Sequence, residues 1–270
     1  MKIALTQMNI AWEDKMKNRD TCERLTREAA AHSADIIVFP EMTLTGFTMN
    51  PEEFGETECR SETEAFFQTL SCRYNTAVVF GYIEKKGSSF YNMLEMTSGG
   101  ETLMKYAKIH PFSYGEESRH YDGGDEIVSA CYKEAYLGGF ICYDLRFPEV
   151  FQISSGKNEI IFVIASWPRS RALHWSALLR ARAIENQCYM IGVNRTGEGG
   201  GQLYQASSEA FDPWGKSIAY VQGEEGFPAD RAELLYAEAE AEQARQYRAE
   251  FPVRADRRNE LYRKLTERGW

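Results

Sequence analysis

Residues 138–149 read GGFICYDLRFPE, and this stretch decides how the rest of the chain is interpreted. The apolar residues 137–141 predict a short buried strand, so Cys142 lies where that strand ends. In open α/β sheets the carboxyl ends of strands face a crevice in which chemistry takes place. A sharp turn there would expose the thiol and aim the backbone N–H of Tyr143 at a substrate oxygen. A single cysteine at a strand end is more often a small buried residue, so the case depends on other strands.

Two other predicted strands also end at side chains that can do chemistry. Residues 35–39 form a β-branched run typical of a buried strand, and Glu41 follows them after a proline. Lys108 follows the strand predicted at residues 101–106. In a crevice, burial would raise the pKa of Glu41 and suit it to proton transfer, whereas in solvent it would be ordinary. Most lysines in the position of Lys108 are solvated, so both interpretations stay open at this point.

Together, Glu41, Lys108 and Cys142 suggest nucleophilic catalysis. A thiol needs help to become a nucleophile, and a nearby ammonium group favours the thiolate electrostatically. Glu41 could take the thiol proton and return it to a leaving amine, while Lys108 and the Tyr143 N–H stabilise the oxyanion. This chemistry requires no histidine.

The composition of the 270-residue chain, with 43% hydrophobic and 26% charged residues, is that of a folded protein of enzyme size. A net charge of −9 argues against binding to nucleic acids or anionic membranes, which needs a basic face. Since there is no signal-like segment and no apolar run of roughly 20 residues, we expect a cytoplasmic protein. We expect free thiols, no metal and no cofactor, because neither the histidines nor the cysteines have metal-ligand spacing: Cys22, Cys59, Cys72, Cys131, Cys142 and Cys188.

Predicted strands and helices alternate, which indicates one layered α/β domain over residues 1–270. Residues 2–9 predict an edge or near-edge strand, and residues 62–74 predict a helix. A later helix of about fifteen residues has one face marked by apolar side chains: Leu173, Ala177, Ala181 and Ile184. The charged residues 229–270 contain enough aromatic side chains to predict a docked arm with short helices.

Several motifs of the chain resemble those of the nitrilase superfamily of carbon–nitrogen hydrolases, over essentially its whole length. The matching segments are IIVFPEM around Glu41, YAKIHPF around Lys108 and ICYDLRFPE around Cys142, then RARAIENQCYMIGVNR and SSEAFDPWG. The resemblance implies an α-β-β-α sandwich and a catalytic triad of Glu41, Lys108 and Cys142. Family members often have a second glutamate after the lysine, which falls best on Glu117, with Glu116 as the close competitor.

The resemblance also implies a homodimer or a higher homo-oligomer. In this family the dimer interface normally uses the helix after the cysteine, and C-terminal arms often cross to the partner. Residues 229–270 fit such an arm. The expected partners are therefore a second copy of the chain and a small amide substrate.

Within the family, the Cys142 segment together with ASWPRSRALHW and ARAIENQ is most similar to the bacterial ω-amidases. This similarity implies hydrolysis of the terminal amide of α-ketoglutaramate and α-ketosuccinamate through a thioester. A free substrate carboxylate needs a cationic partner, for which Arg171 is the first choice. The alternatives are Arg146, Arg169 and Arg195. Phe112, Tyr121 and Trp167 are expected to line the pocket, although core packing explains each of them equally well.

Two departures from close relatives bear on the substrate. Ser166 stands where they usually carry asparagine before Trp-Pro, and residues 206–208 (Ala-Ser-Ser) replace the usual Gly-Asp/His-Ser. The rival functions are an N-carbamoyl amino acid amidohydrolase or a broad aliphatic amidase with the same triad, and a catalytically idle scaffold. Nitrile hydrolysis ranks lower, because no separate feature of the sequence favours it.

Overall fold

The computed structural model describes residues 1–57, 60–223 and 229–269. Cys59 lies outside these residues. The other cysteines are free thiols: Cys22, Cys72, Cys131, Cys142 and Cys188. None of the described helices combines the length and the apolar character needed to cross a membrane.

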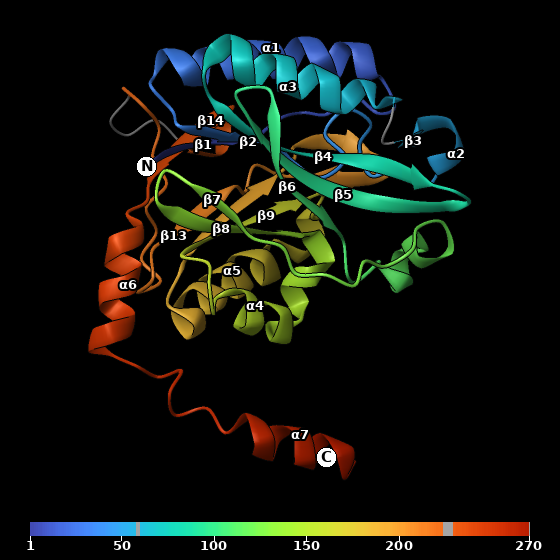
Figure 1. Ribbon diagram of the computed structural model, residues 1–270. Helices are drawn as coiled ribbons and strands as arrows, with labels where there is room; N and C mark the ends of the chain where they lie inside the picture. Colours follow the sequence, from blue (N-terminus) through green and yellow to red (C-terminus); the bar gives the residue numbers. More distant parts are fainter. Residues whose placement is uncertain (58–59, 224–228, 270) are drawn as a thin grey trace.

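Two β-sheets pack face to face, and helices cover their outer faces (Figure 1). Helices α1 (Lys15–Ala31) and α3 (Glu62–Tyr74) cover the first sheet, and α4 (Pro148–Ser154) and α5 (Ala172–Asn186) cover the second. The remaining helices are α2 (Pro51–Phe54), α6 (Ala241–Glu250) and α7 (Asn259–Glu267). The expected α-β-β-α sandwich is confirmed.

The first sheet contains β1 (Lys2–Thr6), β2 (Ile36–Val38), β3 (Glu56–Thr57), β4 (Ala77–Lys86), β5 (Ser89–Ser98), β6 (Glu101–Ala107) and β14 (Leu234–Glu238). Its strand order is β14-β1-β2-β4-β5-β6, and β3 pairs with β4. The near-edge position expected for the first strand is correct, since β1 is second from the edge.

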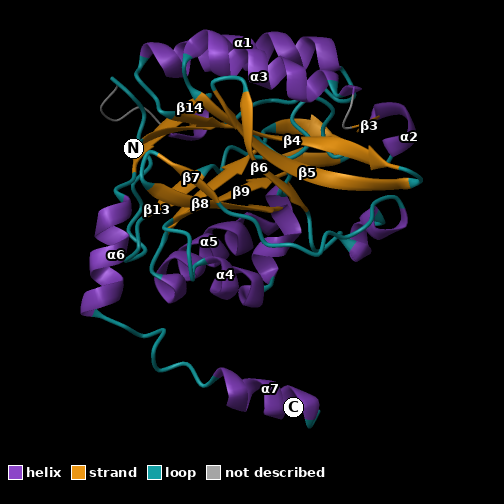
Figure 2. Cartoon of the chain, in the orientation of Figure 1, coloured by secondary structure: helices purple, strands orange, loops and turns teal. Residues whose placement is uncertain are grey.

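The second sheet contains β7 (Ala130–Tyr132), β8 (Ala135–Ile141), β9 (Ile160–Ala165), β10 (Tyr189–Asn194) and β13 (Glu209–Phe211). Its strand order is β13-β10-β9-β8-β7. A separate hairpin is formed by β11 (Gly197–Gly199) and β12 (Gln202–Tyr204). Figure 2 shows the two sheets stacked between the helical layers.

The strand directions determine where the candidate residues emerge. β2 is parallel to β4, and β8 is parallel to β9. β6 runs in the direction of β4, because two antiparallel pairings link them through β5. Glu41, Lys108 and Cys142 follow β2, β6 and β8 respectively, so each lies past the carboxyl end of its strand.

Apolar side chains fill the space between the sheets. Leu94 of β5 and Ile164 of β9 are both fully buried in this layer. Gly139 allows the sheets to approach, because a Cβ there would lie only 2.9 Å from Leu94 Cδ1. A second cluster, which includes Phe67 and Phe80, fills the space between the first sheet and its helices.

The apolar face that the sequence marks on α5 is exposed. Leu173 is 80% exposed and Ile184 is 49% exposed, while Trp175 and Leu179 pack inward. Gly192 of β10 allows the inward face of α5 to pack closely on the sheet, because a Cβ there would lie 2.3 Å from Leu179 Cδ1. The predicted helix is therefore correct, but its exposed apolar stripe is not part of the core of this chain.

The C-terminal segment begins within the domain rather than as an arm. β14 pairs antiparallel with β1, and Ala244 of α6 is buried in the main apolar cluster of the core. Arg248 donates from Nε to the Gln187 carbonyl at 2.9 Å and holds α6 on the domain. Only α7, which has no buried residue among its described positions, extends away from the body (Figure 1).

Candidate active site

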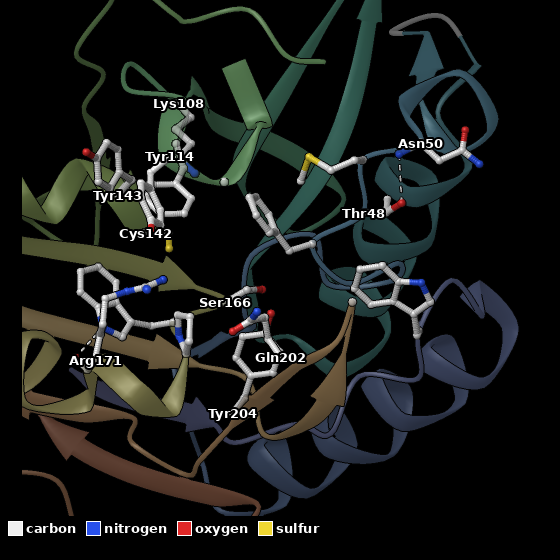
Figure 3. Close-up of a pocket in the computed structure, with 18 of the residues that line it drawn as sticks. Thr48, Asn50, Lys108, Tyr114, Cys142, Tyr143, Ser166, Arg171, Gln202 and Tyr204 are labelled. Carbon is white, nitrogen blue, oxygen red and sulfur yellow. Dashed lines mark hydrogen bonds between the residues drawn. The ribbon is translucent and has the colours of Figure 1, made fainter. Parts of the chain in front are cut away.

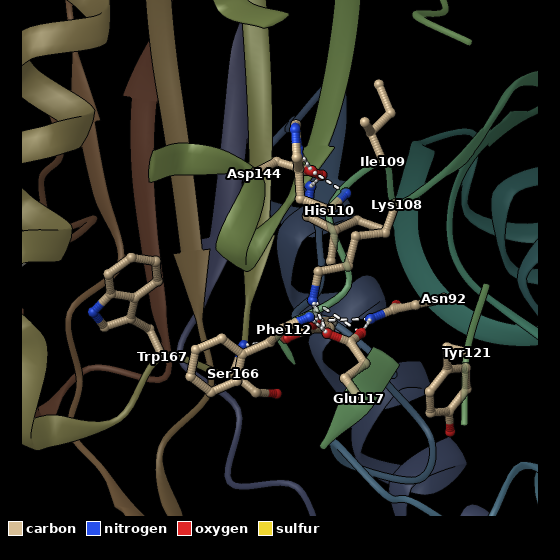
Figure 4. Close-up of polar contacts among 12 residues, drawn as sticks. Asn92, Lys108, Ile109, His110, Phe112, Glu117, Tyr121, Asp144, Ser166 and Trp167 are labelled. Carbon is tan, nitrogen blue, oxygen red and sulfur yellow. Dashed lines mark hydrogen bonds and ion pairs between the residues drawn. The ribbon is translucent and has the colours of Figure 1, made fainter. Parts of the chain in front are cut away.

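Lys108 lies between two buried glutamates (Figure 4). Its Nζ donates to Oε1 of Glu41 at 3.0 Å and to Oε2 of Glu117 at 2.8 Å. Lys108 is 1% exposed and both glutamates are fully buried. Burial alone would lower the pKa of Lys108, but the carboxylates of Glu117 and Glu41 outweigh it and raise that pKa. Lys108 therefore stays an ammonium group.

The structure distinguishes between the two candidate glutamates of the loop. Glu116 has a left-handed backbone with φ of 69°, and its exposed side chain pairs with Arg119. Glu117 points inward and also accepts the Phe112 N–H. Burial raises the pKa of Glu117, and Glu41 raises it further, while Lys108 lowers it. Glu117, not Glu116, is the glutamate beside Lys108.

Asn92 joins the two carboxylates and was missed by the sequence analysis. Its Nδ2 donates to Oε1 of Glu41 at 2.8 Å and to Oε1 of Glu117 at 2.9 Å. The residue is 1% exposed in the middle of β5. An asparagine inside a strand was the available signal, because asparagine is depleted in strands.

Cys142 begins a sharp turn directly after β8, and its φ of 45° lies in the left-handed region. The buried carboxylate of Asp144 holds this turn by accepting the Ile141 N–H at 3.1 Å. Asp144 also accepts the backbone N–H of His110 at 3.0 Å. The same carboxylate therefore fixes both the Cys142 turn and the loop that follows Lys108.

Burial raises the pKa of the Cys142 thiol well above its usual range, and Glu41 raises it further. Lys108 favours the thiolate, as expected, and so does the backbone N–H of Ser166, but neither offsets burial. The reason is that the Lys108 ammonium is already paired with two carboxylates. The resting thiol keeps its proton, so attack requires a base.

The turn after β9 forms a further wall of the site. The Ser166 N–H donates to Oε2 of Glu41 at 2.8 Å. Asn194, at the end of β10, clamps the next residue, because its Oδ1 accepts the Trp167 N–H at 2.7 Å and its Nδ2 donates to the Trp167 carbonyl at 3.0 Å. These bonds fix the turn and hold Glu41 from the opposite side to Lys108.

A pocket of about 570 Å³ opens onto these residues (Figure 3). Its lining includes Lys108, Cys142, Tyr143, Ser166, Phe112, Trp167, Arg146 and Arg171. The candidate nucleophile, the ammonium group and two arginines therefore face one cavity. Such a cavity is large enough for a small organic substrate.

The expected pocket residues Phe112, Trp167 and Arg171 line the cavity. The prediction for Tyr121 is wrong. Its ring is 3% exposed in a core cluster that includes Met42, and its hydroxyl donates to a backbone carbonyl, that of Thr48, at 2.8 Å. Core packing, the alternative explanation, accounts for this aromatic side chain.

The pocket lining also distinguishes among the four arginines that are candidates for binding a substrate carboxylate. Arg146 lines the pocket beside Arg171, whereas Arg169 and Arg195 are outside its lining. Arg195 is fully buried and donates from Nη2 to the carbonyl of Ile10 at 2.8 Å. Arg171 and Arg146 lie over the rings of Phe112 and Trp167. Within the described ranges, neither of these two arginines pairs with a carboxylate.

The α-β-β-α sandwich thus holds a buried lysine between two glutamates, in one site with a cysteine on a strained turn. The family model described as carbon-nitrogen hydrolase matches residues 2–249, and the chain belongs to this family. The predicted membership of the carbon–nitrogen hydrolases is confirmed.

Curated relatives and a solved structure are similar over nearly the whole chain. The 2-oxoglutaramate amidase of Bacillus subtilis (strain 168) is 30% identical, covering 96% of this chain and 98% of the relative. Omega-amidase YafV of Escherichia coli (strain K12) is 32% identical, covering 95% and 96%. The crystal structure of XC1258 from Xanthomonas campestris, a CN-hydrolase superfamily protein, is 29% identical with a TM-score of 0.84, covering 95% of this chain and 97% of that chain. The chain is an amide-hydrolysing enzyme.

Proposed function

We propose that the chain is a cysteine-dependent ω-amidase that converts the terminal carboxamide of a 2-oxo acid into a carboxylate and ammonia. The proposed substrates are α-ketoglutaramate and α-ketosuccinamate. One observation carries the proposal: the Lys108 ammonium group lies between Glu41 and Glu117 in the same pocket as the Cys142 thiol. The names of two relatives, a 2-oxoglutaramate amidase and an omega-amidase, support this substrate class.

In the first proposed step, the Cys142 sulfur attacks the carboxamide carbon while Glu41 takes the thiol proton. The Lys108 ammonium and the Tyr143 N–H stabilise the negative oxygen that forms. Glu41 then gives its proton to the nitrogen, and the C–N bond breaks to release ammonia. A thioester on Cys142 remains. The high thiol pKa agrees with this order, because the proton leaves only as the base accepts it.

In the second proposed step, water attacks the thioester carbon. Glu41 removes a proton from the water and returns it to sulfur as the C–S bond breaks, which releases the acid. Glu117 and Asn92 keep Lys108 and Glu41 in place throughout, because they bond to both ends of that ion pair. Glu117 therefore has a positioning role in this proposal.

Arg171 is the proposed partner of the substrate carboxylate, with Arg146 beside it in the pocket. Phe112 and Trp167 are proposed to contact the substrate through the same wall. Replacing Arg171 with alanine should raise KM for α-ketoglutaramate far more than KM for a neutral aliphatic amide, because only the former carries a charge that loses its partner. The two KM values, measured on one protein preparation, check this prediction. An equal rise in both KM values would show that Arg171 does not pair with the substrate carboxylate.

Cys142→Ala tests the mechanism itself. We expect this variant to release no ammonia from α-ketoglutaramate, and we expect the wild-type protein, quenched during turnover, to carry one acyl group on Cys142. Intact mass measurement provides the second readout. Ammonia release by Cys142→Ala at the wild-type rate would contradict the proposal. Carbon dioxide released together with ammonia from an N-carbamoyl amino acid would favour the carbamoyl alternative, and turnover of neutral amides alone would favour the aliphatic amidase.

A homodimer and a cytoplasmic location remain proposals for this chain. The exposed apolar residues Leu173 and Ile184 on α5 support a second copy of the chain as the partner. The extended helix α7 is the part of the C-terminal segment that is free to contact that copy.

A further inference from the structure

The hydroxyl of Ser166 is a buried polar group that the mechanism above does not use. Ser166 is 5% exposed, and its Oγ has no hydrogen-bond partner among the described residues. The residue lines the same pocket as Cys142 (Figure 3). Buried hydroxyl groups in folded proteins almost always have a partner. Because Ser166 lines the pocket, a molecule bound there can supply this partner.

The position of Ser166 indicates which bound molecule pairs with its hydroxyl group. Its backbone N–H donates to Oε2 of Glu41, and the same N–H lowers the pKa of the Cys142 thiol. Ser166 thus lies against both the proposed base and the proposed nucleophile. The other oxygen of Glu41, Oε1, is already bonded to Lys108 and Asn92. Oε2, which accepts only the Ser166 N–H among the described residues, therefore keeps a lone pair for a molecule that enters from the pocket.

The hydroxyl also has a rigid support. Ser166 follows β9 directly, and the Asn194 side chain bonds both backbone groups of Trp167, the next residue. Pro168 restricts the backbone after it. A group that is fixed before the reaction lowers the entropic cost of orienting a reactant.

Of the reactants that approach Glu41, water depends most on such a group. The amide nitrogen of the substrate is bonded to the carbon under attack, so the acyl part positions it. The attacking water has no covalent link to anything and is oriented only by its hydrogen bonds. A carboxylate oxygen and a neighbouring hydroxyl together define a position for one water molecule.

We propose that Ser166 Oγ holds the water that hydrolyses the Cys142 thioester. This inference rests on the proposed cysteine mechanism and adds a catalytic residue to its second step. The water donates one hydrogen to Oε2 of Glu41 and a hydrogen bond links it to Ser166 Oγ. As its oxygen bonds to the acyl carbon, its proton passes to Glu41 and then to the departing sulfur. Ser166 itself gains and loses no proton.

The experiment measures the two steps separately in Ser166→Ala. Acyl-enzyme is formed with α-ketoglutaramate, excess substrate is removed, and the decay of the Cys142 adduct is followed by intact mass. We expect this decay to slow about three- to tenfold, the value of one hydrogen bond between neutral groups. The kcat/KM for ammonia release should stay at the wild-type value, because it reports only the steps up to the departure of ammonia.

Thr6→Val is the matched control. Thr6 also has a buried hydroxyl without a partner among the described residues, but it lies in β1 outside the pocket lining. Its replacement should leave both the decay of the adduct and kcat/KM unchanged. The decay rate is measured only on protein that has already formed the adduct, so a smaller folded fraction does not affect it.

The possible results separate this inference from the mechanism on which it rests. An adduct that decays equally fast in Ser166→Ala and wild type would overturn the role of the hydroxyl and leave the thioester mechanism intact. A fall in kcat/KM with unchanged decay would also overturn it, since the hydroxyl would then bind the substrate amide. If Cys142→Ala releases ammonia at the wild-type rate, the cysteine mechanism itself fails.

Discussion

Two clusters of buried carboxyl groups in this molecule have similar composition and different surroundings. In the first, Glu41 and Glu117 hold Lys108 at the carboxyl ends of the strands. The second lies on the outer face of the first sheet, beneath α3, and contains Glu64, Glu84 and Glu95 with Lys105. Lys105 is paired with Glu64 at 2.5 Å, and its side chain is 25% exposed.

The difference between the clusters is what each one faces. The first faces a cavity of about 570 Å³ and a cysteine on a strained turn. Among the described residues that line this cavity, none belongs to the second cluster. Burial raises the pKa of a carboxyl group in each of the two clusters, so a raised pKa alone does not identify an active site. A cavity and a nucleophile beside the charges are also required.

The strongest test of this comparison replaces one buried glutamate in each cluster. Glu41→Gln should lower kcat/KM for α-ketoglutaramate by about 100- to 10,000-fold, the usual value of a catalytic acid–base group. Glu84→Gln, which is equally buried, should leave kcat/KM unchanged because Glu84 has no reactant near it. Ammonia release at saturating and limiting substrate measures both values. Equal losses in the two variants would show that buried carboxylates affect activity only through the fold.

The lysines provide a second matched pair with a smaller expected effect. Lys108→Met removes the proposed oxyanion donor, for which the expected loss in kcat is about 100- to 1000-fold. Lys105→Met breaks an ion pair that is partly solvated, so it should change activity little. The comparison of kcat is made on protein whose folding has been checked by circular dichroism. A larger loss of kcat for Lys105→Met than for Lys108→Met would contradict catalysis at the first cluster.

Much of the first cluster could be predicted, because the sequence indicates where strands end. Glu41, Lys108 and Cys142 each follow a predicted strand, and the carboxyl ends of strands in α/β folds face a crevice. Asn92 and Asp144 could not be placed in the same way, since their roles depend on contacts with residues 25 to 51 positions away. Tyr121 was misassigned because an aromatic residue in a loop has the same pattern whether it lines a pocket or fills the core.

The second cluster was not predicted at all, and the reason is also physical. Glu84 and Glu95 lie within strands, and the residues next to them in the chain are buried. Side chains alternate along a strand, so the sequence predicts that these carboxyl groups lie on a solvated face. Here α3 covers that face. The exposed stripe on α5 is the opposite case: helical periodicity identified an apolar face of the helix but not that this face points away from the sheet.

The smallest expected effect concerns the stability of the second cluster. Burial, and then Glu64, raise the pKa of Glu95 to about 8 against the opposing effects of Thr102 and Lys105. An unfolded glutamate has a pKa of about 4.3. Between these two values the folded protein keeps a proton that the unfolded chain loses, so the free energy of unfolding should fall as pH rises from about 5 to 8.

Glu95→Gln should reduce this dependence, because glutamine resembles the protonated carboxyl group at every pH. Its side-chain oxygen can still accept the Thr102 hydroxyl, which bonds to Glu95 Oε1 at 2.7 Å. Urea unfolding at several pH values between 5 and 8 measures the slope in both proteins. A slope that is identical in wild type and Glu95→Gln would mean that Glu95 is ionised in the folded state. Activity at pH 7 should not change, since this cluster does not line the pocket.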